Sequence, residues 1–320
     1  MSVPFLLAPM AEISHRALRE LIESFGNGAD EYYTEMISAG ALVGGGPFEK
    51  WYTDPGPCPQ KLVYQLVGAD GEQLAKAASL LDKFECNDPR TGESGCLGID
   101  INMGCAAPAI TRTGAGVRWM EDMDKAGGMI ALVRKQVKRR LSVKLRLGFV
   151  SRGGSEEAAF GYLVRFCRRL EAEGVELITL HPRSAKEKFK RFARWEYVSA
   201  LRRELGIPVA GNGDIMSAKE MLVKSADCDA VMIGRLAVTK PWIFAEAHAL
   251  RQNGKLALDS GQSTTPQADG LWPLHSESGK PPPAPGLPAP FCLEETGLRF
   301  LELLARYQPP EFHLSRARRF

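Results

Sequence analysis

The chain has 320 residues, with 41 Lys and Arg side chains against 38 Asp and Glu side chains, which gives a formal net charge of +3. Apolar residues make up 44% and charged residues 25%, a composition typical of soluble globular proteins. This excludes a disordered tail protein, a collagen-like chain and a small disulfide scaffold. No run approaches the ~18–20 apolar residues of a membrane helix, and the first residues lack the order of a signal peptide. We therefore expect a soluble, cytoplasmic protein with no membrane partner.

The near-neutral total hides an asymmetry along the chain. Residues 1–130 carry 10 basic and 18 acidic side chains, whereas residues 131–320 carry 31 basic and 20 acidic side chains. A separation of this kind fits an anionic partner bound by the second part, and it also fits a set of solvated helix faces. Charge alone favours the second interpretation.

The seven cysteines, at positions 58, 86, 96, 105, 167, 228 and 292, form no C-x-x-C pair and are odd in number. We therefore expect reduced thiols, with neither a disulfide framework nor a metal site. A cysteine with a functional role would therefore act alone, rather than in a disulfide or a metal site.

Short apolar runs alternate with amphipathic segments along most of the chain. The runs predict eight strands, at Phe5–Met10, Glu31–Ile37, Lys61–Gly68, Leu97–Gly104, Ser142–Gly148, Leu177–Pro182, Pro208–Asp214 and Ala230–Arg235. The segments between them predict helices at His15–Phe25, Glu72–Phe84, Lys125–Val137, Glu156–Glu173, Trp195–Leu205 and Ser217–Ser225. Apolar strands separated by amphipathic helices indicate a parallel sheet covered on both faces. Eight such units predict an α/β fold, a closed (β/α)8 TIM barrel in residues 1–250, rather than an open doubly wound sheet.

The pattern changes after the barrel. Residues 251–292 are rich in Pro, Gly, Ser and Thr, which predicts a flexible insert without a core of its own. Leu293–Tyr307 then predicts an amphipathic helix, and a second helix begins near His313. The apolar side of the first helix is predicted to carry Leu298, Leu301, Leu304 and Ala305. We expect residues 293–320 to be the start of a small C-terminal α-helical domain that is incomplete.

Polar residues and glycines follow nearly every predicted strand. In a barrel of this type the active site lies at these carboxyl ends of the strands. A structural role explains any one of these residues, but the set together indicates a ligand site. Gly213 and Gly234 follow the seventh and eighth strands, where barrels often bind phosphate. For Gly213, a tight turn that needs positive φ is the alternative.

Seven segments together carry a specific resemblance to a known family. They are Ala8–Met10, Asp100–Cys105, Arg112–Gly116, Val143–Gly148, Leu180–Arg183, Gly211–Ile215 and Ile233–Arg235. In this order they resemble the tRNA-dihydrouridine synthases, over about residues 5–245. The resemblance implies an FMN-containing barrel and a helical domain that together hold tRNA. It also implies NADPH as the reductant and reduction of particular uridines to 5,6-dihydrouridine.

The resemblance also implies roles for individual residues. FMN would be bound by Pro9, Met10, Ala11, Gln65, Lys144, His181, Asn212, Gly213, Asp214, Gly234 and Arg235. Asn102 would orient the uracil, and Cys105 would give a proton to C5 while FMN N5 gives hydride to C6. A neutral thiol suits general acid catalysis, and a lysine cation stabilises the charge of reduced flavin. The residues expected to contact tRNA are Asn102, Arg183, Lys186, Lys188, Arg191 and Arg316.

Two alternatives stay open. One is a flavin-dependent oxidoreductase of a free pyrimidine, similar to dihydroorotate dehydrogenase, which would not need the basic residues after the sixth strand, among them Lys186, Lys188 and Arg191, or the helical tail. The other is a non-catalytic RNA-binding barrel. It is suggested by Ala106, which stands where the family usually has a proline directly after the cysteine. In each case we expect no metal and a monomer.

Overall fold

The computed structural model describes residues 2–83, 95–148, 155–187, 190–259 and 293–320. In this part of the chain, nine parallel strands form one sheet that closes on itself. They are β1 Phe5–Leu7, β2 Glu31–Tyr33, β3 Ile37–Ser38, β4 Leu62–Val67, β5 Gly98–Met103, β6 Arg140–Arg146, β7 Leu177–His181, β8 Val209–Asn212 and β9 Ala230–Ile233. The barrel closes because β1 pairs with both β9 and β2, and β2 also pairs with β4.

The strand predicted at 31–37 is divided into β2 and β3, which both pair with β4. Between them the side chain of Thr34 replaces a backbone partner, because its hydroxyl accepts a hydrogen bond from Gln65 N at 3.0 Å. The two short strands together occupy one position of the barrel. The predicted (β/α)8 barrel is therefore confirmed.

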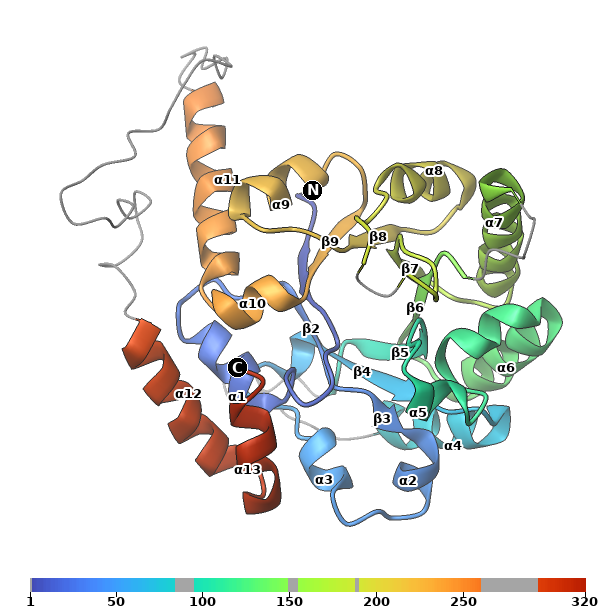
Figure 1. Ribbon diagram of the computed structural model, residues 1–320, viewed down its shortest axis with the longest axis horizontal. Helices are drawn as coiled ribbons and strands as arrows, with labels where there is room; N and C mark the ends of the chain where they lie inside the picture. Colours follow the sequence, from blue (N-terminus) through green and yellow to red (C-terminus); the bar gives the residue numbers. More distant parts are fainter. Residues whose placement is uncertain (1, 84–94, 149–154, 188–189, 260–292) are drawn as a thin grey trace.

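Helices surround the barrel (Figure 1). Those that match predicted helices are α1 Arg16–Glu23, α4 Gly71–Asp82, α6 Met123–Gln136, α7 Glu156–Ala172, α8 Glu196–Glu204 and α9 Ala218–Lys224. Shorter helices are α2 Ala39–Val43, α3 Glu49–Tyr52, α5 Pro108–Thr111 and α10 Arg235–Thr239. Side-chain caps begin several of them; Asp70, for example, accepts a hydrogen bond from Gln73 N at the start of α4. Among the described residues, none of the helices combines the length and apolarity needed to span a bilayer.

Two apolar clusters, one on each face of the sheet, explain why the strands are continuous apolar runs in the sequence. Neighbouring residues of a strand point to opposite faces. In β1, Phe5 and Leu7 pack outward in the large cluster shared with the helices, whereas Leu6 belongs to a small cluster with Tyr33, Val63 and Met232. Burial on both faces explains why most residues of the strands are apolar.

Three further helices follow the barrel. They are α11 Ile243–Asp259, α12 Leu293–Tyr307 and α13 Pro310–Ala317. Helix α11 continues past residue 251, the predicted start of the insert, and residues 260–292 lie outside the described part of the chain. Both predicted C-terminal helices are present; α12 packs against α1, and α13 against α12 (Figure 1).

The apolar face predicted for α12 is wrong in part. Phe300 and Leu304 are buried, but Leu298 and Leu301 are 64% and 48% exposed. The buried ring of Phe300 lies between His15 on the barrel side and Phe320, with ring centroids 5.8 Å and 4.0 Å away. The helix is therefore rotated so that aromatic packing, rather than the longest row of leucines, meets the barrel.

Candidate active site

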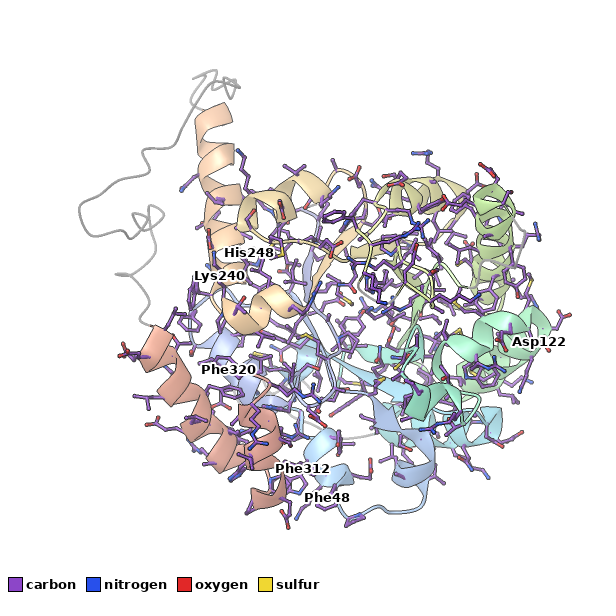
Figure 2. The ribbon with its side chains drawn as sticks, viewed as in Figure 1. Phe48, Asp122, Lys240, His248, Phe312 and Phe320 are labelled. Carbon is purple, nitrogen blue, oxygen red and sulfur yellow. The ribbon has the colours of Figure 1, made fainter. Side chains whose placement is uncertain are left out.

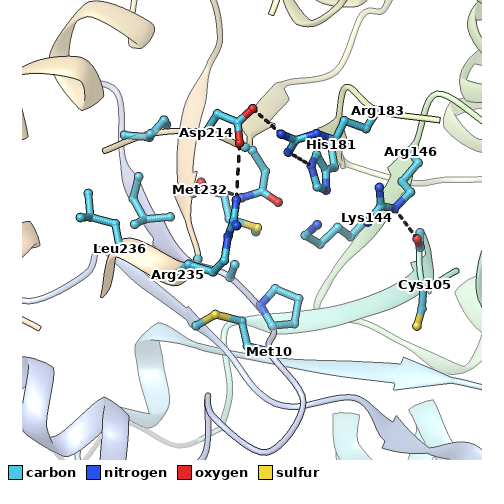
Figure 3. Close-up of a pocket in the computed structure, with 18 of the residues that line it drawn as sticks. Met10, Cys105, Lys144, Arg146, His181, Arg183, Asp214, Met232, Arg235 and Leu236 are labelled. Carbon is cyan, nitrogen blue, oxygen red and sulfur yellow. Dashed lines mark hydrogen bonds and ion pairs between the residues drawn. The ribbon is translucent and has the colours of Figure 1, made fainter. Parts of the chain in front are cut away.

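A cavity of about 440 Å³ opens at the carboxyl ends of the strands. Predicted site residues that line it are Pro9, Met10, Ala11, Asn102, Cys105, Lys144, His181, Arg183, Asn212, Gly213, Asp214, Gly234 and Arg235. They come from six separate segments of the chain. Figure 3 shows Lys144 and Cys105 on one side of the cavity and Asp214 and Arg235 on the other. The barrel thus brings most of the predicted site together.

Strand β6 supplies two cations to the cavity. Lys144 and Arg146 are two residues apart and therefore share a face of the strand. Burial, and secondly the charge of Arg146, lower the pKa of Lys144 to about 8. Among the described residues, no hydrogen bond or ion pair engages Lys144 Nζ, and Figure 3 shows its side chain reaching into the cavity. The amine is therefore available to a ligand.

Opposite these cations, Asp214 joins two arginines. Its carboxylate accepts a hydrogen bond from Arg183 Nη2 at 2.5 Å and lies 3.5 Å from Arg235 Nη2. Partial burial raises the pKa of Asp214, but the hydrogen bonds from Arg183 and Ala193 N and the charges of the two arginines together hold the pKa below its usual value. Two cations against one carboxylate leave this end of the cavity positively charged.

His181 lies between the two groups of cations. Burial, and then the charges of Lys144 and Arg146, lower its pKa to about 2. The ring is therefore neutral near pH 7 and offers one donor and one acceptor nitrogen. Its Nε2 lies 3.1 Å from Arg183 Nη1, where the donor must be the guanidinium.

Gly213 is the position where the backbone itself shapes the cavity. Its φ is +132°, and a Cβ built on it would lie 3.0 Å from the Cβ of Ala193 and 3.1 Å from Cδ2 of His181. An L side chain rarely adopts this conformation, and there is no space for one. Gly213 therefore lets the β8 loop pass close under the ring of His181.

Asn102 fixes the loop that carries Cys105. Its Oδ1 accepts hydrogen bonds from Gly104 N at 3.2 Å and Cys105 N at 2.9 Å. Arg146 Nε donates to Gly104 O at 2.9 Å, so the loop is held from two sides (Figure 3). The side chain of Cys105 is half-buried at the cavity wall.

Gln65, which was predicted to bind the cofactor, is not among the residues that line the cavity. It is fully buried beneath Asn102, whose Nδ2 donates to Gln65 Oε1 at 2.8 Å. Its Nε2 donates to Asp100 Oδ2 at 2.6 Å, and Ser142 Oγ donates to the other oxygen at 2.7 Å. Burial raises the pKa of Asp100 to about 6. Gln65 therefore supports Asn102 from below, because the strand register sets Gln65 beside Asp100.

The residues predicted to contact tRNA divide into three groups. Lys186 and Arg191 are exposed beyond β7, the latter with 74% of its side chain accessible, and Lys188 lies outside the described residues. Arg183 is a buried part of the cavity rather than of the surface. Arg316 is also buried, and its Nη1 lies 2.6 Å from Oε2 of Glu35. Arg316, predicted to contact tRNA, is therefore engaged inside the protein in this structure.

Several lining residues were not assigned from the sequence. They are Ala8, Met36, Gly104, Arg146, Ile215, Met216, Met232, Ile233, Leu236 and Thr239. Arg146 carried a signal, since it stands two residues after Lys144 in a strand. The apolar ones carried none, because a methionine that lines a cavity has the same sequence signature as one in the core.

Comparisons with known proteins agree with these motifs. A family model described as dihydrouridine synthase (Dus) matches residues 6–260, which include the whole cavity lining. A "Probable tRNA-dihydrouridine synthase" of Aquifex aeolicus is 32% identical over 247 residues, covering 75% of this chain and 71% of that protein. One from Rhizobium leguminosarum is 30% identical and covers 74% and 69%. A "tRNA-dihydrouridine synthase B" of Pectobacterium carotovorum is 28% identical and covers 78% and 73%.

Proposed function

Because the chain belongs to the dihydrouridine synthase family, we propose that it binds FMN in this cavity and reduces uridines of tRNA to 5,6-dihydrouridine with NADPH as reductant. The observation that supports this most is the cavity itself, in which cations and a thiol from separate strand ends surround an apolar floor. The names of the relatives support tRNA as the substrate.

The residues present fit FMN. A volume of about 440 Å³ lies within the usual range for small-molecule sites. Pro9, Met10 and Met232 offer an apolar surface to a planar ring, while the arginines around Asp214 offer charge to a phosphate. Lys144 has no partner among the described residues, as expected of an amine reserved for a ligand.

The bound cofactor would supply the hydride that C6 of the pyrimidine accepts. Lys144, a cation near pH 7, would stabilise negative charge at the polar edge of the flavin. Neutral His181, whose Nε2 accepts from Arg183, would donate a hydrogen bond from Nδ1 without adding charge. Cys105 Sγ would donate the proton to C5, and Asn102 would keep the thiol's loop in place.

A uridine stacked inside folded tRNA cannot reach a cavity at the barrel mouth, so the base must leave its stack. Phosphate contacts would supply most of the affinity. Lys186 and Arg191 are exposed on the connection that follows β7, one of the strands that ends at the cavity. They would bind the RNA backbone beside the extruded base.

The test is to incubate the FMN-loaded protein with NADPH and unmodified tRNA and to map dihydrouridine. The wild-type protein should form it, and Cys105→Ala should lose about two or more orders of magnitude in rate. Cys228→Ala is the matched control, because this thiol is buried away from the cavity.

Each contrary result points to one alternative. Reduction of free uracil or orotate, with none in tRNA, would replace the proposal by an oxidoreductase of free pyrimidines. Bound FMN and bound tRNA without turnover would favour a non-catalytic barrel. A wild-type protein that binds no FMN would contradict the cofactor assignment itself.

A further inference from the structure

One buried carboxylate connects the last helix to the loop that lines the cavity. Glu35, just after β2, is 3% exposed, and its two oxygens serve different segments. Its Oε1 accepts a hydrogen bond from Glu12 N at 2.5 Å. Its Oε2 accepts one from Arg316 Nη1 at 2.6 Å, from helix α13. The side chains of Glu35 and Arg316, which are 281 positions apart in the chain, are therefore in direct contact.

The amide of Glu12 matters because of where it stands. It directly follows Pro9, Met10 and Ala11, which line the cavity. Glu12 has a φ of +64°, a left-handed conformation that costs a non-glycine residue ~1 kcal/mol or more. Such a conformation persists only where neighbouring groups hold it. The charge-assisted hydrogen bond to Glu35 is one such group.

The ionised form of Glu35 is in turn stabilised by Arg316. Burial raises the pKa of Glu35, and the charge of Arg316 is the largest effect that opposes it. The guanidinium lies 4.7 Å from the ring centroid of Phe312 and 5.7 Å from that of Tyr52, so aromatic faces enclose the pair. A buried carboxylate left without its cation takes up a proton or moves toward water. Either change weakens its hold on Glu12 N.

Aromatic packing keeps α13 in this place. The ring of Phe312 lies 4.9 Å from that of Phe48, at the barrel side, and Figure 2 shows the two side by side. Phe320 stacks on Phe300 at the end of the chain. Helix α13 is thus docked where Arg316 meets Glu35.

We propose that Glu35 and Arg316 are positioning residues for the cavity loop, so that docking of α13 sets the affinity of the barrel for FMN. This inference rests on the FMN site proposed above. It gives the C-terminal segment a role in cofactor binding, besides any contact with RNA.

The test compares FMN affinity, measured by quenching of flavin fluorescence, across matched variants of the full chain. Arg316→Met and Glu35→Gln should each raise the Kd for FMN by about tenfold, and Arg316→Lys should recover part of the loss. Arg318→Met, at the exposed C-cap of the same helix, is the surface control. Val133→Ala, a buried change in α6, is the control for lost stability alone. Both controls should bind FMN as the wild type does.

Hydrogen exchange of the protein without FMN supplies a second measurement. The amide of Glu12 should exchange faster in Arg316→Met than in the wild type and both controls. If the wild-type protein binds no FMN, the proposed cofactor fails, and faster exchange at Glu12 still supports the coupling. Unchanged FMN affinity in well-folded Arg316→Met and Glu35→Gln would overturn the inference, as would FMN loss in the Val133→Ala control equal to theirs.

Discussion

Replacing Lys144 by Met should stabilise the protein without FMN near neutral pH, although it removes a functional group. The cavity lowers the pKa of this amine from 10.5 to about 8, first through burial and then through Arg146. At ~1.4 kcal/mol for each pH unit, the charged amine costs the folded state about 3 kcal/mol. The cost arises because no described residue pairs with Nζ, as expected of an amine kept for a ligand.

The stability difference between the wild type and Lys144→Met should change only within a defined range of pH. Below pH 8 the amine is protonated in both the folded and the unfolded chain, so the full cost is present. Between pH 8 and 10.5 the unfolded chain binds more protons, so the wild type gains stability relative to Lys144→Met. Above this window the amine is neutral in both states and the cost vanishes.

Urea denaturation of both proteins between pH 7 and 10.5 measures this difference directly. We expect the stability advantage of Lys144→Met over the wild type to shrink by about 3 kcal/mol across the window. Lys144→Arg, which keeps a charge throughout, should show no such shrinkage. A difference between wild type and Lys144→Met that stays constant with pH would refute the reasoning.

Three other substitutions test separate parts of the site. Asn102→Ala removes the acceptor for Cys105 N, and it should lower the single-turnover rate of dihydrouridine formation by about tenfold; an unchanged rate would contradict this. Gly213→Ala should cost ~1–3 kcal/mol in thermal unfolding, because φ is +132° and Ala193 fills the space; an unchanged Tm would count against it. Asp214→Asn should destabilise the protein at pH 7 but much less below pH 3.8, since a carboxylate with a lowered pKa stabilises only while it is ionised. Urea denaturation at both pH values checks this, and an equal loss at each would contradict it.

The sequence predicted the site best where the barrel topology alone brings the residues together. Once eight strands are recognised, their carboxyl ends must meet at one mouth, so Met10, Lys144 and His181 are brought together by topology alone. Their exact contacts need not be known. This is why site residues predicted from strands far apart in the chain line one cavity.

The sequence failed where a side chain's partner depends on register or on docking. Gln65 lies within β4, where Asp100 and Asn102 occupy both ends of its amide. Arg316 looks like a surface cation, but the docking of α13 places it against Glu35. These partners are far away in the sequence, so no local pattern could predict the contacts.

The charge asymmetry along the chain includes both basic residues in buried or partly buried ion pairs and exposed ones. Part of the basic excess after residue 130 is structural, since Arg140 and Arg316 pair with Glu31 and Glu35 from the acidic first part. Arg191, with 74% of its side chain accessible, is one of the exposed basic residues that we propose for contact with the RNA backbone. Arg191→Gln should therefore weaken tRNA binding and reduce its salt dependence by about one phosphate contact. Arg140→Gln should instead lower thermal stability and leave that salt dependence unchanged. If both substitutions change the salt dependence equally, then the net charge of the barrel, rather than the exposure of single side chains, determines the salt dependence of tRNA binding.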